Sequence, residues 1–462
     1  MTRAVLARLD EWRWCLGACV VALAVLAEFV RIGGDWDWLV AMGDHVVSTG
    51  SVPDSVPFAA ADTSGWRNVP VLAELLAAGL HALGERTVVL VHLVLVGATL
   101  GVLAVAARGR GARDAYVGGA LAALVGGSLT TLGVVRAQTL SLLPFALLLA
   151  LVARQARRPD RGIWWAVPLV VVWGNLHGAA LLGTCVLGAY LLLHRLPRRP
   201  LETVGVGVAA LVGLCVTPQG WHTPQYYAEV FDNVSAQRAE GLWARPALDA
   251  PFDVLMLLAA IGLGVLALRN RRDLWEYVAV AGLAVATASA ARHGVWLLLL
   301  LVLMAAGRRE GRDGAGEPGE DVRGAALRGA VSVVCVAGVA CSVAVPLALL
   351  RGQAVLGARP AVVETVAEVA GDRVVLAPAP LSEALAVAGV RLWVSNPLDA
   401  FGHDDQAAYL DFLDGRPGGR AALAQVDLVV VSEASAPQAL VADDPAFIRQ
   451  PCGERWTCYV RR

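Results

Sequence analysis

Long apolar runs without charged residues constrain the fold of this chain more than any other feature. Segments 88–107 and 330–350 contain no Asp, Glu, Lys or Arg. About 20 such residues in a helix, rising 1.5 Å each, cross the hydrocarbon core of a bilayer, so these runs predict transmembrane helices. Only 17% of the residues are charged, whereas a soluble domain has about a quarter. We expect a polytopic α-helical membrane protein.

Eleven apolar segments fit this pattern and predict about 11 transmembrane helices. They lie at 15–32, 87–107, 115–134, 138–153, 163–177, 179–193, 202–217, 252–268, 275–291, 295–306 and 329–350. No small-residue cleavage site follows the first segment, so we interpret it as a retained span and not a signal peptide. The expected organisation is a transmembrane domain at 1–350 and a second domain at 351–462.

Arginine clusters between the spans predict the orientation. With eleven spans, six clusters fall on one face: Arg3, Arg8 and Arg13; Arg108, Arg110 and Arg113; Arg154, Arg157, Arg158 and Arg161; Arg195, Arg198 and Arg199; Arg269, Arg271 and Arg272; Arg308, Arg309, Arg312, Arg323 and Arg328. The positive-inside rule makes this face, and the N-terminus, cytoplasmic. This count requires helix breaks at 175–178 and 292–294. The first loop, 33–70, and the C-terminal domain are then extracytoplasmic.

The composition also bears on location and partners. All basic residues are Arg and none is Lys, and Ala, Val, Leu and Gly are abundant, which suggests a GC-rich bacterial genome and hence a bacterial plasma membrane. The net charge of −1 argues against a nucleic-acid partner, which would need a large basic excess. The lipid bilayer is the expected environment.

The C-terminal domain, 351–462, has short β-branched runs separated by helical patterns at 404–413 and 419–424. This alternation predicts a small α/β domain with a largely parallel sheet. Cys452 and Cys458 are spaced so that a short hairpin can join them by a disulfide, which persists only in an oxidising compartment; two unpaired thiols are the alternative. Residues 396–399 follow a run at 390–395 that we expect to be a strand, and we interpret them as a turn rather than a ligand site.

The first loop carries the most informative polar residues. Asp35 and Asp37 follow the first span and are bracketed by Trp36 and Trp38. Carboxylates near hydrocarbon are costly unless they are solvated or paired, so this pair suits proton abstraction, a divalent cation or a bound polyol. The alternative is a solvated acidic loop anchored by interfacial tryptophans. Segment 71–83 is too short to span and is predicted to lie along the interface, closing a cavity over the loop.

This pattern resembles the GT-C superfamily of membrane glycosyltransferases, whose best-known members are dolichyl-phosphate-mannose protein mannosyltransferases. The closest likeness is to a bacterial branch without an assigned substrate. The resemblance rests on the Asp-x-Asp after the first span and on Arg136-Ala137-Gln138, 173–178, 217–220 and Leu242-Trp243. It implies transfer of a sugar from a polyprenyl phosphate to an unknown envelope acceptor. It also implies that Asp37 is the general base and Asp35 a supporting carboxylate, or the reverse.

The resemblance further implies which other residues bind substrate. External cations would hold the lipid phosphate, and Arg136, Arg292 and His293 lie at outer ends of spans. For the two arginines, snorkelling is the alternative. Asn175 and His177 would border the cavity, although Asn175 could equally cap a helix. The complete set of expected substrate-binding residues is Trp36, Trp38, Asp44, His45, Arg136, Gln138, Asn175, His177, Arg292 and His293.

The sequence departs from the family where related chains often have further titratable side chains. Leu39-Val40 and 70–72 occupy those places. A non-catalytic GT-C scaffold or lipid-binding envelope assembly protein is therefore the alternative function. No cofactor is implied except a divalent cation, which two Asp residues alone would hold weakly, and no metal-ligand spacing is present.

Overall fold

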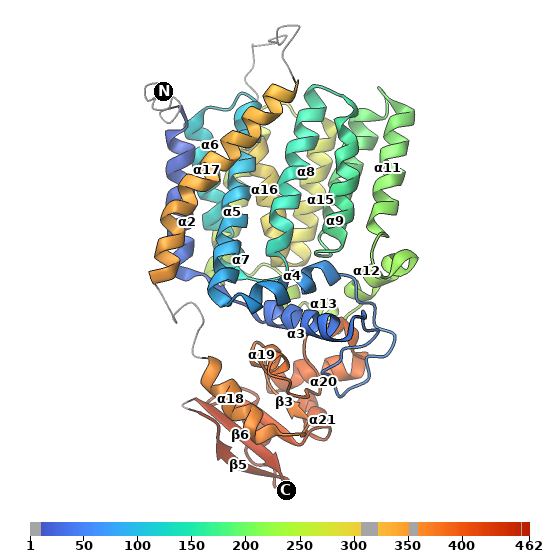
Figure 1. Cartoon of the computed structure of the whole chain (residues 1–462), viewed down its shortest axis with the longest axis vertical. Coiled ribbons are helices and arrows are strands. Elements are labelled where there is room, and N and C mark those ends of the chain that lie inside the picture. The colour runs from blue at the N-terminus through green and yellow to red at the C-terminus, as the bar shows by residue number, and fades with distance from the viewer. Residues whose placement is uncertain (1–10, 306–321, 351–358, 454) are drawn as a thin grey trace.

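The computed structural model describes residues 11–305, 322–350, 359–453 and 455–462 (Figure 1). A helical bundle forms one end of the molecule, and a small domain with a β-sheet forms the other. The last bundle helix, α17 (Val322–Leu350), ends at the predicted domain boundary. Residues 351–358, which follow it, lie outside the described residues. Five arginines of the predicted clusters also lie outside the described residues: Arg3, Arg8, Arg308, Arg309 and Arg312.

The bundle is made of apolar helices whose side chains pack mainly on one another. Among the described residues, three are long and apolar enough to cross a membrane: α5 (Glu85–Gly109), α8 (Thr139–Arg157) and α14 (Pro251–Leu268). The other bundle helices are shorter or only partly described: α2 (Arg13–Phe29), α6 (Asp114–Gly127), α9 (Ala166–Gly174), α10 (Ala180–Tyr190), α11 (Pro200–Leu214), α15 (Leu274–Ser289), α16 (Gly294–Ala305) and α17. The count of eleven spans therefore stays a prediction.

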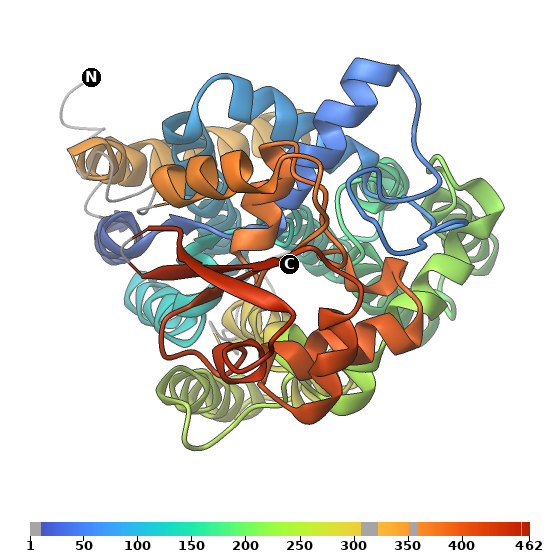
Figure 2. The same ribbon diagram turned by 90° about the horizontal axis from the view of Figure 1, so that it is seen from below.

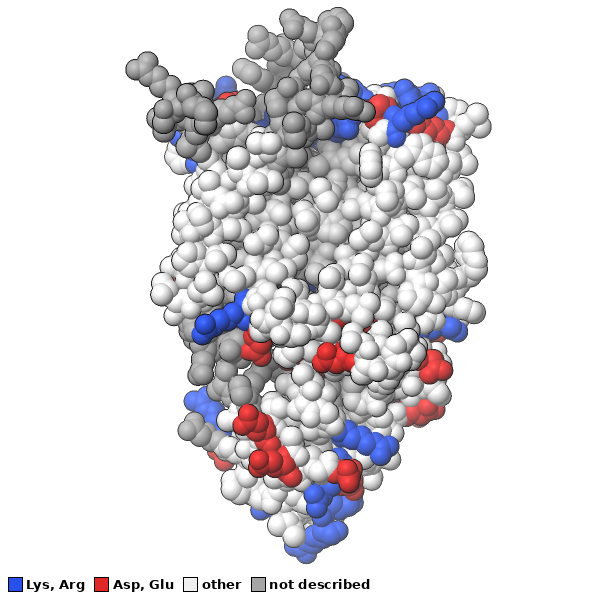
Figure 3. All heavy atoms as spheres, viewed as in Figure 1, with Lys and Arg blue, Asp and Glu red and all other residues white. Residues whose placement is uncertain are grey.

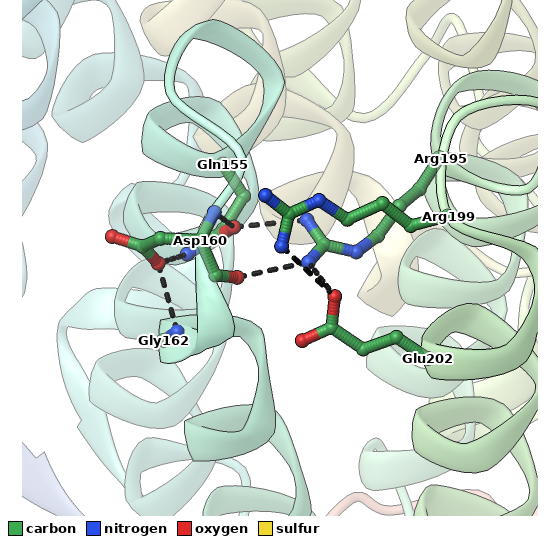
Figure 4. Close-up of polar contacts among 6 residues, drawn as sticks. All are labelled: Gln155, Asp160, Gly162, Arg195, Arg199 and Glu202. Carbon is green, nitrogen blue, oxygen red and sulfur yellow. Dashed lines mark hydrogen bonds and ion pairs between the residues drawn. The ribbon is translucent and has the colours of Figure 1, made fainter.

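Charged side chains are absent from a broad band of the bundle surface seen in Figure 3, and they gather at its two ends. At the end far from the C-terminal domain, Arg195 is fully buried in a π-helical turn after α10. It donates hydrogen bonds to Gln155 Oε1 at 3.0 Å, to the Asp160 carbonyl at 2.8 Å and to Glu202 Oε2 at 2.9 Å (Figure 4). This network joins the ends of three helices at the arginine-rich face.

The expectation of a loop throughout 33–70 is wrong for its first half. Residues Gly34–Thr49 form helix α3, and only the remainder, up to Pro70, is irregular. The segment is apolar at helical spacing, and its two aspartates occupy the first turn, where the helix dipole favours carboxylates. Helix α4 (Val71–Ala82) packs on α3 so closely that a Cβ at Gly43 would lie 2.1 Å from the Glu74 carbonyl oxygen.

The C-terminal domain has a mixed sheet, so the expectation of a largely parallel one is wrong. The strand order is β3 (Val375–Leu376), β4 (Leu428–Ser432), β6 (Trp456–Arg461) and β5 (Phe447–Pro451). Only β3 and β4 are parallel. Strands β5 and β6 are joined by a short turn, and such neighbours can only pair antiparallel. The Cys452–Cys458 disulfide joins the residue that follows β5 to the third residue of β6, near the turn of this hairpin.

Helices flank this sheet and place it against the bundle. They are α18 (Arg359–Ala370), α19 (Leu381–Val387), α20 (His403–Leu413), α21 (Arg420–Leu423) and α22 (Gln438–Val441). Helix α19 packs on α3, and α20 packs on α13 (Val234–Arg238). The apolar run before residue 396 is not a strand: Leu392 forms isolated parallel bridges to Ala59 of the first loop and to Val375. The first loop and the C-terminal domain are thereby joined through backbone hydrogen bonds.

Candidate active site

A cavity of about 690 Å³ lies where the bundle meets the C-terminal domain. Figure 2 shows this end of the molecule, with the C-terminal domain in front of the helix ends and α3 and α12 (Thr223–Phe231) beside it. The cavity wall combines the start of α3, the outer ends of bundle helices, α12 and loops of the C-terminal domain. Seven of the twelve predicted catalytic and substrate-binding residues line it: Asp35, Trp38, Arg136, Gln138, His177, Arg292 and His293.

Backbone pairing brings the first predicted carboxylate next to the first predicted cation. Strand β1 (Arg31–Ile32) pairs in parallel with β2 (Val134–Val135), and the Gly33 N–H donates to the Val135 carbonyl at 2.9 Å. A Cβ at Gly33 would lie 2.8 Å from Val134 Cγ1, so this approach requires glycine. The pairing sets Asp35, two residues past β1, and Arg136, directly after β2, in one cavity wall.

Helical geometry separates the residues that the sequence grouped as one acidic motif. Residues two apart on a helix point about 200° apart, so Asp35 and Asp37 face different sides of α3. Asp35 and Trp38 line the cavity, whereas Asp37 and Trp36 are not part of its lining. Trp36 is instead packed in the bundle core.

Asp44 and His45 lie further along α3 and also fall outside the cavity lining. Asp44 is exposed, and the backbone carbonyl of His45 accepts hydrogen bonds from two hydroxyls that close the helix. The structure therefore places only the first turn of α3 at the site.

Two guanidinium groups give the bundle side of the cavity its positive charge. Arg292 lies in the 3-10 turn between α15 and α16, with its Cζ 4.0 Å above the ring of Trp243. Gln138 donates a hydrogen bond to the Arg292 carbonyl at 3.0 Å and fixes this turn to α8. Within the described chain, neither Arg136 nor Arg292 forms an ion pair with a carboxylate. The charges of Asp35 and Asp399 act on Arg292 without a direct ion pair. Two cations in one wall that no direct ion pair neutralises form a site for an anion.

The two histidines of this wall add hydrogen-bonding groups but no charge at neutral pH. Burial lowers the pKa of His293 to about 4, and the nearby Arg292 charge lowers it further in the same direction. Burial also lowers the pKa of His177 to about 3. His177 Nδ1 accepts from the Ala179 N–H at 3.1 Å, whereas His293 Nδ1 has no hydrogen-bond partner among the described residues. Arg136 and Arg292 therefore carry the positive charge.

Asn175 has the role that was the alternative to a substrate contact. It ends α9, and its Nδ2 donates to the Val171 carbonyl at 2.9 Å and to the Val216 carbonyl at 2.6 Å. It is not among the cavity-lining residues. The polar side chain therefore closes one helix and ties it to the end of α11, as helix-terminal Asn commonly does.

The cavity continues into the bundle as an apolar groove. Leu181, Leu182 and Cys185 of α10 line it together with Ala286 and Ser289 of α15. Cys185 is exposed. By helical rise it lies roughly 12 Å from His177, so the groove extends along α10 away from the polar chamber.

The sequence interpretation missed the residues that the C-terminal domain adds to the cavity: Glu383, Asn396, Asp399 and Tyr409. Glu383 is 1% exposed and accepts hydrogen bonds from Asn396 Nδ2 at 2.5 Å and from Ser382 Oγ at 2.9 Å. Burial raises the pKa values of Glu383 and Asp399, and the charge of Asp35 raises that of Glu383 further. Only segment 396–399 of these was considered as a possible ligand site from the sequence, where the turn interpretation was preferred.

The described residues contain no group of three or more His, Cys, Asp or Glu that could hold a metal ion. Of the predicted aspartate pair, Asp35 lines the cavity and Asp37 does not, so helix α3 offers one carboxylate to a cation there.

Comparison with protein-family models and with curated proteins gives no match. Several solved structures are similar to this chain, and two of them match nearly its whole length. ArnT from Cupriavidus metallidurans bound to undecaprenyl phosphate is 13% identical, with a TM-score of 0.49 over 96% of this chain and 97% of that chain. The arabinofuranosyltransferase AftD from Mycobacteria is 15% identical, with a TM-score of 0.45 over 97% of this chain.

This chain spans only 41% of the length of AftD. Both proteins are GT-C glycosyltransferases, the superfamily that the sequence resembles. At these identities the likeness concerns the fold alone, and both TM-scores are below 0.5. The function is therefore argued from the residues of this chain.

Proposed function

We propose that this protein is a membrane glycosyltransferase that moves a sugar from a polyprenyl phosphate to a hydroxyl group of an extracytoplasmic acceptor. The observation that carries the proposal is the cavity wall, in which Asp35 lies together with two guanidinium groups that form no direct ion pair with a described carboxylate. A base and an anion site in one chamber are what transfer from a lipid phosphate requires.

Each side chain then has a defined task in the transfer. Asp35 accepts the proton of the acceptor hydroxyl, and the acceptor oxygen forms a bond to the anomeric carbon of the sugar. The bond from that carbon to the phosphate oxygen breaks, and its electron pair leaves with the phosphate. Arg136 and Arg292 stabilise the charge that develops there. Asp35 thus replaces Asp37 as the proposed base, because only Asp35 lines the cavity.

The apolar groove along α10 supports a lipid-linked donor. A polyprenyl chain needs an apolar path to the bilayer, and the groove leads from the polar chamber to the exposed Cys185. A soluble nucleotide sugar would use neither this groove nor an opening at the bundle surface. The expected orientation follows from the arginine clusters, with the cavity on the extracytoplasmic side of a bacterial plasma membrane.

The test measures polyprenyl phosphate released from a panel of polyprenyl-phosphate sugars by the purified protein, with envelope extract as acceptor. Wild type is compared with Asp35→Asn, Asp37→Asn and Asp54→Asn. Asp54 is an exposed aspartate of the first loop outside the cavity and is the matched control. Removal of a general base lowers the rate roughly 10²- to 10⁴-fold, and this loss is expected for Asp35→Asn alone.

The outcomes separate the candidate functions. Normal release by Asp35→Asn, together with loss in Asp37→Asn, would return the base to Asp37. Binding of polyprenyl phosphate without release from any donor would favour the non-catalytic scaffold. Absence of both binding and release would reject the proposed function.

A further inference from the structure

The C-terminal domain forms a wall of the cavity and is not an appendage. Three of its segments contribute lining residues: the start of α19, the loop 396–399 and helix α20. Gly34 at the start of α3 lets this wall approach, because a Cβ there would lie 3.1 Å from Glu383 Oε2. Whatever fills the chamber therefore contacts the bundle on one side and this domain on the other.

Charge is divided between the two sides. The described carboxyl groups of the C-terminal wall are Glu383 and Asp399, whereas the bundle side carries Arg136 and Arg292. The donor phosphate belongs at the guanidinium side for electrostatic reasons. The carboxyl side offers oxygen acceptors and no described cation to pair with an anionic group, so it fits the uncharged, hydroxyl-bearing part of a substrate.

Asp399 is the group of this wall that is available to a ligand. Glu383 is already bonded to Asn396 and Ser382, but Asp399 is partly exposed to the chamber and forms no ion pair with any described residue. Its carboxyl oxygens can accept hydrogen bonds from hydroxyl groups. Burial raises the pKa of Asp399, whereas the Trp66 indole and the Arg292 charge act in the opposite direction.

The cavity lining that contains Asp399 also contains hydrogen-bond donors without a described partner and aromatic rings. Trp38 is 8% exposed, and its Nε1 has no hydrogen-bond partner among the described residues. The buried hydroxyl oxygen of Tyr227, a partly exposed residue of the cavity wall, also has none there. Leaving a buried donor unpaired costs about 1–3 kcal/mol, and a ligand with oxygen acceptors would relieve this cost. The rings of Trp38 and Trp66 pack edge to face with centroids 6.3 Å apart and make this part of the wall aromatic.

We propose that the C-terminal wall, through Asp399, binds a neutral saccharide acceptor. This inference rests on the proposed function in taking the cavity as the transfer site, and it names the class of acceptor. A hydroxyl of that saccharide would then lie between the wall and Asp35, where it can lose its proton.

The test measures binding of methyl glycosides to the full-length protein in detergent by saturation-transfer NMR. The probes are methyl glucoside, methyl mannoside, methyl galactoside and methyl arabinoside, each compared with a uronate or carboxylate counterpart where one exists. Wild type should bind at least one neutral glycoside, and should bind the matched uronoside at least 10-fold more weakly. Binding by no neutral glycoside, or equal binding of the uronosides, would overturn the proposal.

Variants locate the site. Asp399→Ala should weaken neutral glycoside binding roughly 10-fold, whereas Asp399→Asn, which retains hydrogen bonding, should stay within about 3-fold of wild type. Asp372→Asn, an exposed aspartate of the same domain, is the matched control. Polyprenyl phosphate binding, measured in parallel, should not change in any of them. If wild type does not bind polyprenyl phosphate, the proposed function is rejected. If Asp399→Ala binds the neutral glycoside as wild type does, only this inference is rejected.

Discussion

Replacing Arg292 should separate anion recognition from lipid recognition. Its guanidinium group is stacked on Trp243 and forms no ion pair with a described carboxylate, so the substitution Arg292→Gln breaks no direct ion pair and removes only the longer-range attraction to Asp35 and Asp399. A hydrogen bond to a charged group contributes about 1.5–3 kcal/mol, which corresponds to a roughly 10- to 150-fold loss of affinity for polyprenyl phosphate. Arg292→Lys should give an intermediate loss, because lysine keeps the charge but not the planar fork.

The assay titrates polyprenyl phosphate into detergent-solubilised protein and follows tryptophan fluorescence, since Trp243 lies against Arg292. Neutral polyprenol of the same length is titrated in parallel. Arg86→Gln, an exposed arginine at the start of α5, is the matched control and should bind like wild type. The reasoning is refuted if Arg292→Gln binds polyprenyl phosphate as tightly as Arg86→Gln does, or if it loses affinity for polyprenol to the same degree.

Three further predictions concern stability. Burial raises the pKa of Glu74 to about 7, so protonation of this carboxyl group contributes fully to stability below pH 4.5, and the contribution is lost as pH rises through 7. Glu74→Gln should therefore be about 3 kcal/mol more stable than wild type at pH 8 in thermal unfolding. If the stability of both proteins depends on pH in the same way, this prediction is wrong. Arg195→Met should lower the free energy of unfolding by about 3 kcal/mol, because it leaves Glu202 and Gln155 without this partner. Replacing Cys452 and Cys458 by serine should cost about 2 kcal/mol in the C-terminal domain, and reducing agent should then have no additional effect.

The bundle could be predicted from sequence because its signal is local. Apolar runs of sufficient length specify helices wherever they occur, and the breaks expected at 175–178 and 292–294 are both present between helices. The same local patterns gave Arg136, His177 and Arg292 as polar residues at helix ends, and the structure places all three in one cavity.

Two expectations were wrong although the sequence contained the information needed: the loop at 34–49 and the parallel sheet. Treating 34–49 as a loop left Asp35 and Asp37 equivalent, whereas a helical interpretation would have set them on different faces. The mixed sheet was also within reach of the sequence. A disulfide that closes a short hairpin between Cys452 and Cys458 already requires antiparallel strands, which is incompatible with a parallel arrangement of those two strands.

The carboxyl wall could not be found from sequence, because it depends on contacts between distant segments. Glu383 and Asp399 meet Asp35 only because α19 packs on α3 and Leu392 bridges to Ala59, and no local pattern encodes either contact. The resulting chamber holds guanidinium groups that form no direct ion pair with a described carboxylate and a buried indole donor that has no acceptor among the described residues. Each of these groups lowers the stability of the empty protein unless a bound molecule supplies its partner. A chamber with cations on one side and hydroxyl-binding groups on the other is most stable when it holds an anion joined to a polyol, which is the composition of a sugar phosphate.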